Sequence, residues 1–275
     1  MPRPRLLVLL LLALLPLAAA PRRVVSQAVG TDELLLALAA PGQVAALSNL
    51  ARDSRYSPVA AQARAYPSLK DSDAESVLAF HPDLVLATSY TRPETLALLR
   101  RAGVRLLVFD RFDTLDDVYA DLRTLGQALG RQAQASALIA QCRARVAALA
   151  KRLQGVRPVR VLAASLYPYT AGAGTTFQDL CDHAGALNVA AEAGLRGHQP
   201  TPAERMLAWN PEVLVADDEP DILARLGQIP AYRLLPAFRA GRVVRLPEAL
   251  LSSVSQHRID AYEALARALH PERFK

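Results

Sequence analysis

Two glutamates at the same place in a repeated segment are the first residues whose position suggests a chemical role. The segment AESVLAFHPDLVLA begins at Ala74, and the similar segment AERMLAWNPEVLVA begins at Ala203. Glu75 and Glu204 are therefore matched residues, and each stands three positions after a hydroxyl residue, the spacing of a helix capping box. A capping role would satisfy a backbone N–H. Two matched carboxylates on one face would instead suit a two-fold symmetric partner with a basic socket in each half.

Tyrosine and arginine residues gather in the segments that follow the predicted strands, and half of the chain's eight tyrosines lie there. The candidate ligand-binding residues are Tyr56, Tyr90, Arg92, Tyr167, Tyr169, Arg196, His257 and Arg258. Flat rings and guanidinium groups suit a large, partly apolar ligand with carboxylate or phosphate edges. Ferric siderophores, haem and cobalamin all meet this description. Taken singly, each of these residues could equally be an ordinary solvated loop residue.

Spacings typical of resident metals and of catalysis are missing from the sequence. The histidines form no HxH or HExxH pattern, and Cys142 and Cys181 form no CxxC pattern. A directly bound zinc or manganese ion, which needs three or four convergent ligands, is kept as an alternative function. The two cysteines could pair in an oxidising compartment or stay as buried thiols.

A secreted hydrolase of α/β fold is the alternative from another class of protein. No GxSxG motif supports it, and the turn AGAGTTF from Ala171 lacks the lysine of a phosphate-binding loop. The acidic run DDEPD from Asp217 is interpreted as a solvated loop. We therefore expect neither enzymatic activity nor a resident cofactor.

The elements that must position these residues alternate between strands and helices. In the first half, strands are expected at 23–29, 43–48, 83–89 and 104–110, and helices at 31–40, 74–80 and 93–103. Thr31 is expected to cap the first helix, and Pro202 to open the helix that carries Glu204. Leucine spacing from 115 to 153 predicts two helices broken at Gly130. The second of these would be about 34 Å long.

Alternation resumes in the second half. Strands are expected at 159–165, 212–217 and 242–247, and helices at 175–185, 203–209 and 257–270. The prediction is an α/β fold with two lobes of mainly parallel sheet joined by one long rigid helix. Its divisions are a signal peptide at 1–20, an N-terminal lobe at 21–130, a linking helix at 131–155 and a C-terminal lobe at 156–275.

The order of these segments resembles the iron-chelate and vitamin B12 class of periplasmic solute-binding proteins, which serve ABC importers. The resemblance runs from RVVS through both repeated segments and YTAGAGTTFQDLCDHAGALNVAAEAGLRG to the closing LHPERF. It implies a class III fold with the cargo held between the lobes, as a metal chelate. It also implies docking on an ABC permease dimer through arginines that contact Glu75 and Glu204. A monomer is expected.

Composition and the N-terminus agree with export. Arg3 and Arg5 precede an apolar run and small residues up to Ala20, the order of a secretory signal, and no lipobox cysteine is present. A periplasmic location follows as an expectation; an uncleaved N-terminal anchor is the alternative. The net charge of +6 comes from scattered arginines with no basic tract, so no nucleic-acid partner is expected.

Overall fold

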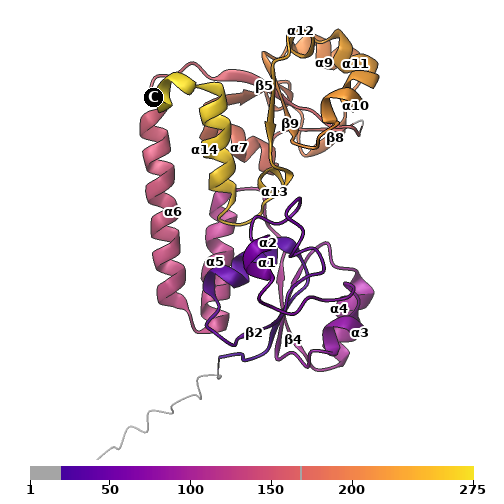
Figure 1. The fold of residues 1–275 in the computed structure, drawn as a ribbon, viewed down its shortest axis with the longest axis vertical. Coiled ribbons are helices and arrows are strands. Elements are labelled where there is room, and N and C mark those ends of the chain that lie inside the picture. Colours follow the sequence, from indigo (N-terminus) through magenta and orange to yellow (C-terminus); the bar gives the residue numbers. More distant parts are fainter. Residues whose placement is uncertain (1–19, 168) are drawn as a thin grey trace, which may run out of the picture.

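The computed structural model describes residues 20–167 and 169–275, which form two α/β lobes stacked along the long axis of the molecule (Figure 1). The predicted signal peptide falls on residues that lie almost entirely outside this described part. No helix within 20–167 and 169–275 combines the length and apolarity that a membrane span requires.

The N-terminal lobe is a parallel four-stranded sheet in the order β2-β1-β3-β4. Its strands are β1 (Val24–Ser26), β2 (Val44–Ala46), β3 (Leu84–Thr88) and β4 (Arg105–Phe109). Its helices are α1 (Val29–Leu38), α2 (Ala60–Ala63), α3 (Ala74–Leu78) and α4 (Pro93–Arg101). All four predicted strands and the three predicted helices are confirmed. Every residue of β3 is buried, as expected for a central strand covered on both faces.

The C-terminal lobe repeats this topology. Its parallel sheet has the order β10-β9-β5-β7, so the third strand along the chain again lies beside the first. The strands are β5 (Val159–Ala163), β7 (Ala186–Asn188), β9 (Val213–Asp217) and β10 (Val243–Leu246). The helices are α7 (Thr176–Ala184), α8 (Val189–Glu192), α9 (Ala203–Trp209), α10 (Ile222–Gln228), α11 (Pro230–Leu234), α12 (Pro236–Arg239), α13 (Glu248–Leu251) and α14 (Arg258–Leu269), followed by the 3-10 helix η1 (Pro271–Phe274).

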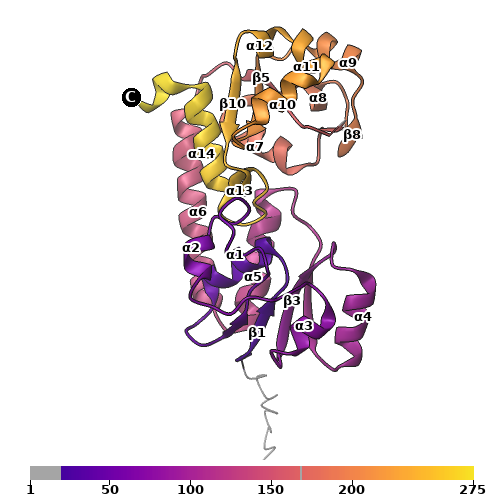
Figure 2. The same ribbon diagram turned by 45° about the vertical axis from the view of Figure 1, so that its right-hand side comes forward.

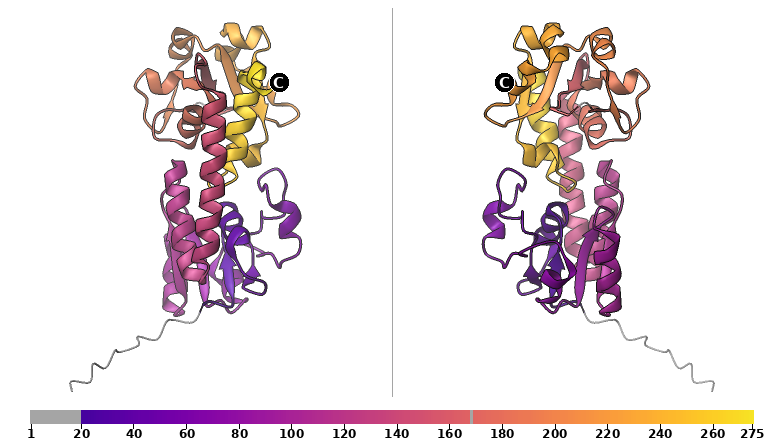
Figure 3. Two further views of the ribbon diagram at one scale, coloured as in Figure 1. Left: turned by 90° about the vertical axis from the view of Figure 1, so that its left-hand side faces the viewer. Right: turned by 90° about the vertical axis from the view of Figure 1, so that its right-hand side faces the viewer.

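Two long helices connect the lobes. The chain leaves β4 through α5 (Leu115–Leu129), reverses at Gly130 and returns through α6 (Gln132–Arg152) to β5. Gly130 has φ of 70°, a left-handed conformation that glycine adopts without strain, so the predicted break is confirmed. Figure 3 shows α5 and α6 side by side, with α6 continuing along the C-terminal lobe and α14 beside it.

One hydrophobic cluster runs through both lobes. It joins Val24 and Leu84 of the first sheet to Leu122 of α5, Ile139 of α6 and Tyr262 of α14. Cys142 and Cys181 also lie in this cluster, and both are buried and unpaired. Each sheet thus packs one face on the helices that connect the lobes. Separate clusters cover the other faces, under α3 and α4 in one lobe and under α9 to α12 in the other.

The repeat extends to backbone conformation. α3 precedes β3 as α9 precedes β9, and the residue before each proline is left-handed, with φ of 46° at His81 and 45° at Asn210. A proline disfavours right-handed helical angles at the residue before it, and both helices stop short of their proline as predicted, α3 at Leu78 and α9 at Trp209.

Several local expectations were wrong or incomplete. Helix α1 begins at Val29 rather than at the expected cap Thr31, which instead bonds back to Ala28 from inside the first turn. The antiparallel pair β6 (Tyr169–Ala171) and β8 (His198–Pro200) had no counterpart in the prediction, and neither did α10 to α12. Short strands that pair with a segment distant in the sequence leave little local pattern by which to predict them.

Candidate ligand cleft and docking glutamates

A cavity of about 620 Å³ lies where the strands of the C-terminal sheet end. Its walls come from the residues after β5, the end of β9, the first turn of α7, and α13. Tyr56 reaches it from the N-terminal lobe, so the cavity lies between the two lobes. The carboxyl ends of parallel strands are where ligands bind in open α/β sheets, and this volume is typical of small-molecule sites.

Three of the predicted ligand residues line this cavity. They are Tyr56, Tyr167 and Tyr169, whose side chains are all exposed, with Tyr167 at 76%. His198 of β8 lies there as well. Exposed tyrosine rings around a cavity are poised to lose water when a flat ligand enters, which is how aromatic side chains contribute most to binding.

Tyr90 and Arg92 line a smaller cavity of about 240 Å³ in the N-terminal lobe. It lies at the carboxyl ends of β1 and β3, beside Gln27 and Ser72. The Tyr90 ring stacks on Phe112 with centroids 6.0 Å apart, yet 85% of the side chain stays exposed. This smaller cavity shares no lining residue with the 620 Å³ cavity.

Arg196, His257 and Arg258 lie outside the lining of the 620 Å³ cavity. Arg196 is exposed and lies just before β8, where it forms an isolated β-bridge with Ala173. The His257 ring pairs with the Asp260 carboxylate at 3.2 Å. Arg258 is only 3% exposed, and its guanidinium is occupied by protein groups. The interpretation of Arg258 as a cleft residue is therefore corrected: it is part of the junction between the lobes.

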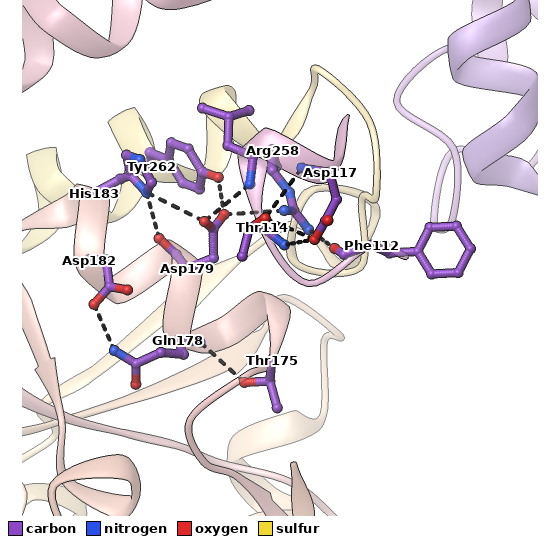
Figure 4. Close-up of polar contacts among 11 residues, drawn as sticks. Phe112, Thr114, Asp117, Thr175, Gln178, Asp179, Asp182, His183, Arg258 and Tyr262 are labelled. Carbon is purple, nitrogen blue, oxygen red and sulfur yellow. Dashed lines mark hydrogen bonds and ion pairs between the residues drawn. The ribbon is translucent and has the colours of Figure 1, made fainter. Parts of the chain in front are cut away.

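A buried ion pair forms the centre of that junction (Figure 4). Arg258 donates to Asp179 of α7 at 3.2 Å and to the Phe112 carbonyl at 2.8 Å. Asp179 also accepts from the backbone N–H of Leu115, at the start of α5, and from the hydroxyl of Tyr262. One carboxylate thus holds α5, α7 and α14 together.

A second buried carboxylate joins the lobes from the other direction. Glu33 of α1 is 1% exposed and accepts hydrogen bonds from Ser253, at 2.7 Å, and from Ser255. Both serines belong to the C-terminal segment between α13 and α14. Burial raises the pKa of Glu33 despite these bonds. The lobes are therefore pinned at two buried points as well as by a common core.

A group of acidic residues, the acidic wall, lines the C-terminal side of the cleft and was not predicted from the sequence. Asp217 and Glu219 follow β9 and line the 620 Å³ cavity, together with Glu248 of α13, whereas the sequence suggested only a solvated loop. Arg225 pairs with Glu219 at 2.6 Å. Across the cleft, the hydrogen bond to Asp53 raises the pKa of Arg55, and the charge of Glu219 adds to this effect. The rule that strand ends face the ligand would have found Asp217.

The Glu248 carboxyl is predicted to make stability depend on pH. Burial, followed by the charges of Asp217, Glu219 and Asp218, raises the pKa of Glu248 to about 7. A carboxyl whose folded pKa is raised contributes stability below its unfolded pKa and loses it as pH rises through the folded value. Glu248→Gln should therefore melt at a higher temperature than wild type at pH 8, and this advantage should vanish at pH 4 to 5.

Differential scanning calorimetry of both proteins across this range measures the effect. Glu94→Gln, a change at an exposed position of α4, serves as the control and should show no such crossover. An advantage of Glu248→Gln that is the same at every pH would contradict the assignment.

The helices that carry the matched glutamates lie on the side of the molecule remote from α6. α3 and α9 face that side in separate lobes, a placement visible in Figures 1 and 2. Glu75 and Glu204 are both exposed, and each is the second residue of its helix. Within 20–167 and 169–275, neither carboxylate has a hydrogen-bond or ion-pair partner.

The capping boxes predicted from the sequence are wrong. Asp73, not Ser72, caps α3 by accepting from the backbone N–H of Ser76 at 2.7 Å. At α9 the cap position is held by Pro202 itself, without any side-chain bond, and the Thr201 hydroxyl donates to the Gln199 carbonyl instead. The structural explanation for two matched glutamates is thus reduced to a favourable interaction with the helix dipole.

No group of three His, Cys, Asp or Glu side chains suited to a metal ion occurs within the described ranges. Two parallel α/β lobes around a cleft, pinned together and connected by long helices, define a solute-binding protein of the two-lobe type. The chain belongs to the periplasmic binding protein family, whose model matches residues 24–250. This is a family of binding proteins of the Fe/B12 type and not of enzymes.

Known relatives differ in the ligand that they are named for. A cobalamin-binding protein of Halobacterium salinarum is 29% identical over 226 residues, which cover 78% of this chain and 61% of that protein. The molybdate-binding protein MolA of Haemophilus influenzae is 25% identical over 233 residues, 75% of this chain and 66% of MolA. The periplasmic heme-binding protein RhuT of Roseiflexus sp. RS-1 superimposes with a TM-score of 0.80 at 27% identity, over 92% of this chain and 99% of RhuT.

Proposed function

We propose that the protein captures a metal chelate, a ferric siderophore, haem or cobalamin, in the periplasm and delivers it to an ABC permease dimer. The observation that carries this proposal is the interlobe cavity of about 620 Å³ edged by exposed tyrosines. A cavity of this size accommodates a molecule of many atoms, and its tyrosine faces suit a flat, conjugated one. The proposed contacts are Tyr56, Tyr167 and Tyr169, with Tyr90 and Arg92 from the facing lobe.

Molybdate, the ligand named for one relative, fits this cleft less well. An oxyanion is bound by convergent N–H donors or cationic groups at close range. The C-terminal wall of the cavity carries Asp217 and Glu219, whose charges would repel it, and Arg225 is already paired with Glu219. A small anion would also leave most of the cavity unfilled.

Delivery is proposed to use Glu75 and Glu204. The two carboxylates are exposed and have no partner within the described residues, and their helices α3 and α9 lie in separate lobes on one side of the molecule. This arrangement matches a partner with two-fold symmetry. Charge complementarity of this kind sets orientation and speeds encounter. The buried contacts that Asp179 and Glu33 make between the lobes would keep the distance between Glu75 and Glu204 constant while the protein diffuses.

Visible absorption spectra test the cargo directly. The purified protein is incubated separately with haem, cyanocobalamin and ferric enterobactin or ferrichrome, desalted, and scanned. One chelate should stay bound in a one-to-one ratio and raise the melting temperature, as any ligand that prefers the folded state does. Molybdate should leave the melting temperature unchanged. A rise with molybdate and retention of none of the chelates would overturn the proposal.

A further inference from the structure

We propose that an apolar side pocket beneath α9 receives an apolar substituent of the cargo. The pocket has a volume of about 230 Å³ and shares Ser165 to Tyr167, Tyr169 and Thr170 with the interlobe cavity, so the two spaces adjoin. Its remaining walls are Met206 of α9, Ile229, and Ala231 and Tyr232 of α11, with Thr201 at the edge. This inference rests on the proposed function, because it assigns part of the same cargo.

Apart from the exposed Tyr167 and Tyr169, the polar residues that line the side pocket already have protein partners. The Tyr232 hydroxyl donates to the Ser165 carbonyl at 3.0 Å and accepts from the Ser165 N–H at 2.8 Å. Thr170 donates to the Ala163 carbonyl at 3.2 Å, and Thr201 to the Gln199 carbonyl at 3.1 Å. Water entering the pocket would therefore find few free groups to bond, which favours an apolar occupant.

The size of the side pocket sets the class of group that fits. A dry apolar cavity of about 150 Å³ is enough to bind benzene. At about 230 Å³, the pocket takes a phenyl-sized ring or a branched alkyl group but not a whole chelate. The cargo is thus a chelate with such an apolar substituent on the edge that meets the C-terminal lobe, while its polar edge faces Arg55 and the N-terminal lobe.

The side pocket also brings the cargo against the helix that carries the docking carboxylate. Met206 is 5% exposed and points inward from α9, whereas Glu204, two residues earlier, is exposed. An occupied pocket would fill space directly under α9 and support it by packing contacts.

Met206 makes the test direct, because Met1 and Met206 are the only methionines in the sequence. Protein labelled with 13C at the methionine ε-methyl groups gives at most two signals, and Met206→Leu identifies the buried one. Toluene is then titrated as the probe. We expect a saturable shift of the Met206 signal, which Ala231→Phe should abolish by filling the pocket. Ala208→Phe, which adds the same ring at an exposed position of α9, should keep the toluene response.

The outcomes separate the side pocket from the proposed function. A shift that never saturates in the wild-type protein, or one that is unchanged in Ala231→Phe, would show that no apolar subsite exists. Should Ala231→Phe not fold, the wild-type titration decides alone. The Met206 signal must also shift when the chelate retained in the absorption experiment is added. Toluene binding without that second shift would overturn the cargo role, whereas retention of no chelate would overturn the proposed function itself.

Discussion

The double substitution Glu75→Ala/Glu204→Ala should abolish uptake of the cargo while leaving its capture unchanged. Both carboxylates are exposed and unpaired within the described residues, so their loss removes no hydrogen bond or ion pair there. At an interface with arginines, each lost charge pair costs about 2–5 kcal/mol. Losing both should weaken permease binding by about a thousandfold or more. Ligand affinity should stay at the wild-type value, because neither residue lines the cleft.

Uptake of the labelled chelate in cells, and stimulation of permease ATPase activity in vesicles, measure this effect. The control is Glu94→Ala/Glu272→Ala, which removes two exposed glutamates that do not occupy matched positions. Each single substitution at Glu75 or Glu204 should give an intermediate loss. Uptake that persists in the double variant would leave the two glutamates with a helix-dipole role only.

Substitution of Asp179 by alanine should destabilise the protein by about 3–5 kcal/mol. The change leaves the Arg258 guanidinium, 3% exposed, without its carboxylate, and it orphans the N–H of Leu115 and the hydroxyl of Tyr262. An uncompensated buried charge is among the most costly changes a single substitution can make. Because these groups join α5, α7 and α14, the lobes should also lose part of their fixed relative orientation.

Urea denaturation measures the free energy, and small-angle scattering measures the spread between the lobes. Asp182→Ala is the matched control, because Asp182 lies on the same helix, is exposed and accepts a hydrogen bond from the Gln178 side chain at 2.6 Å. It should cost less than about 1 kcal/mol. Equal destabilisation by the two variants would mean that Asp179 acts only through helix α7 and not through the junction.

The repeated segment shows which features of the fold can be predicted from residues close together in the sequence. Buried strands such as β3, prolines after α3 and α9, and Gly130 between the long helices all depend on residues within a few positions of one another. Their hydrophobic spacing and backbone preferences therefore predict them well. Local pattern could not assign the caps, because Asp73 and Ser72 offer equivalent side chains one position apart and only the local backbone chooses between them.

Arg258 and the acidic wall show where local pattern ends. Arg258 looks like a loop arginine beside a strand end until α7 brings Asp179 to it from 79 positions away. Glu248 and Asp217 come from separate elements, and it is burial in the folded protein, followed by the charges of Asp217 and its neighbours, that raises the pKa of Glu248.

The sequence by itself determined the two-lobe α/β architecture, the helices that connect the lobes and the matched pair of glutamates, because each follows from short-range periodicity and a repeat. The tertiary structure alone decided which tyrosines share a cavity, which arginine is buried in an ion pair and where an apolar pocket adjoins the cleft. Those properties arise from contacts between residues distant along the chain, for which no short-range pattern exists.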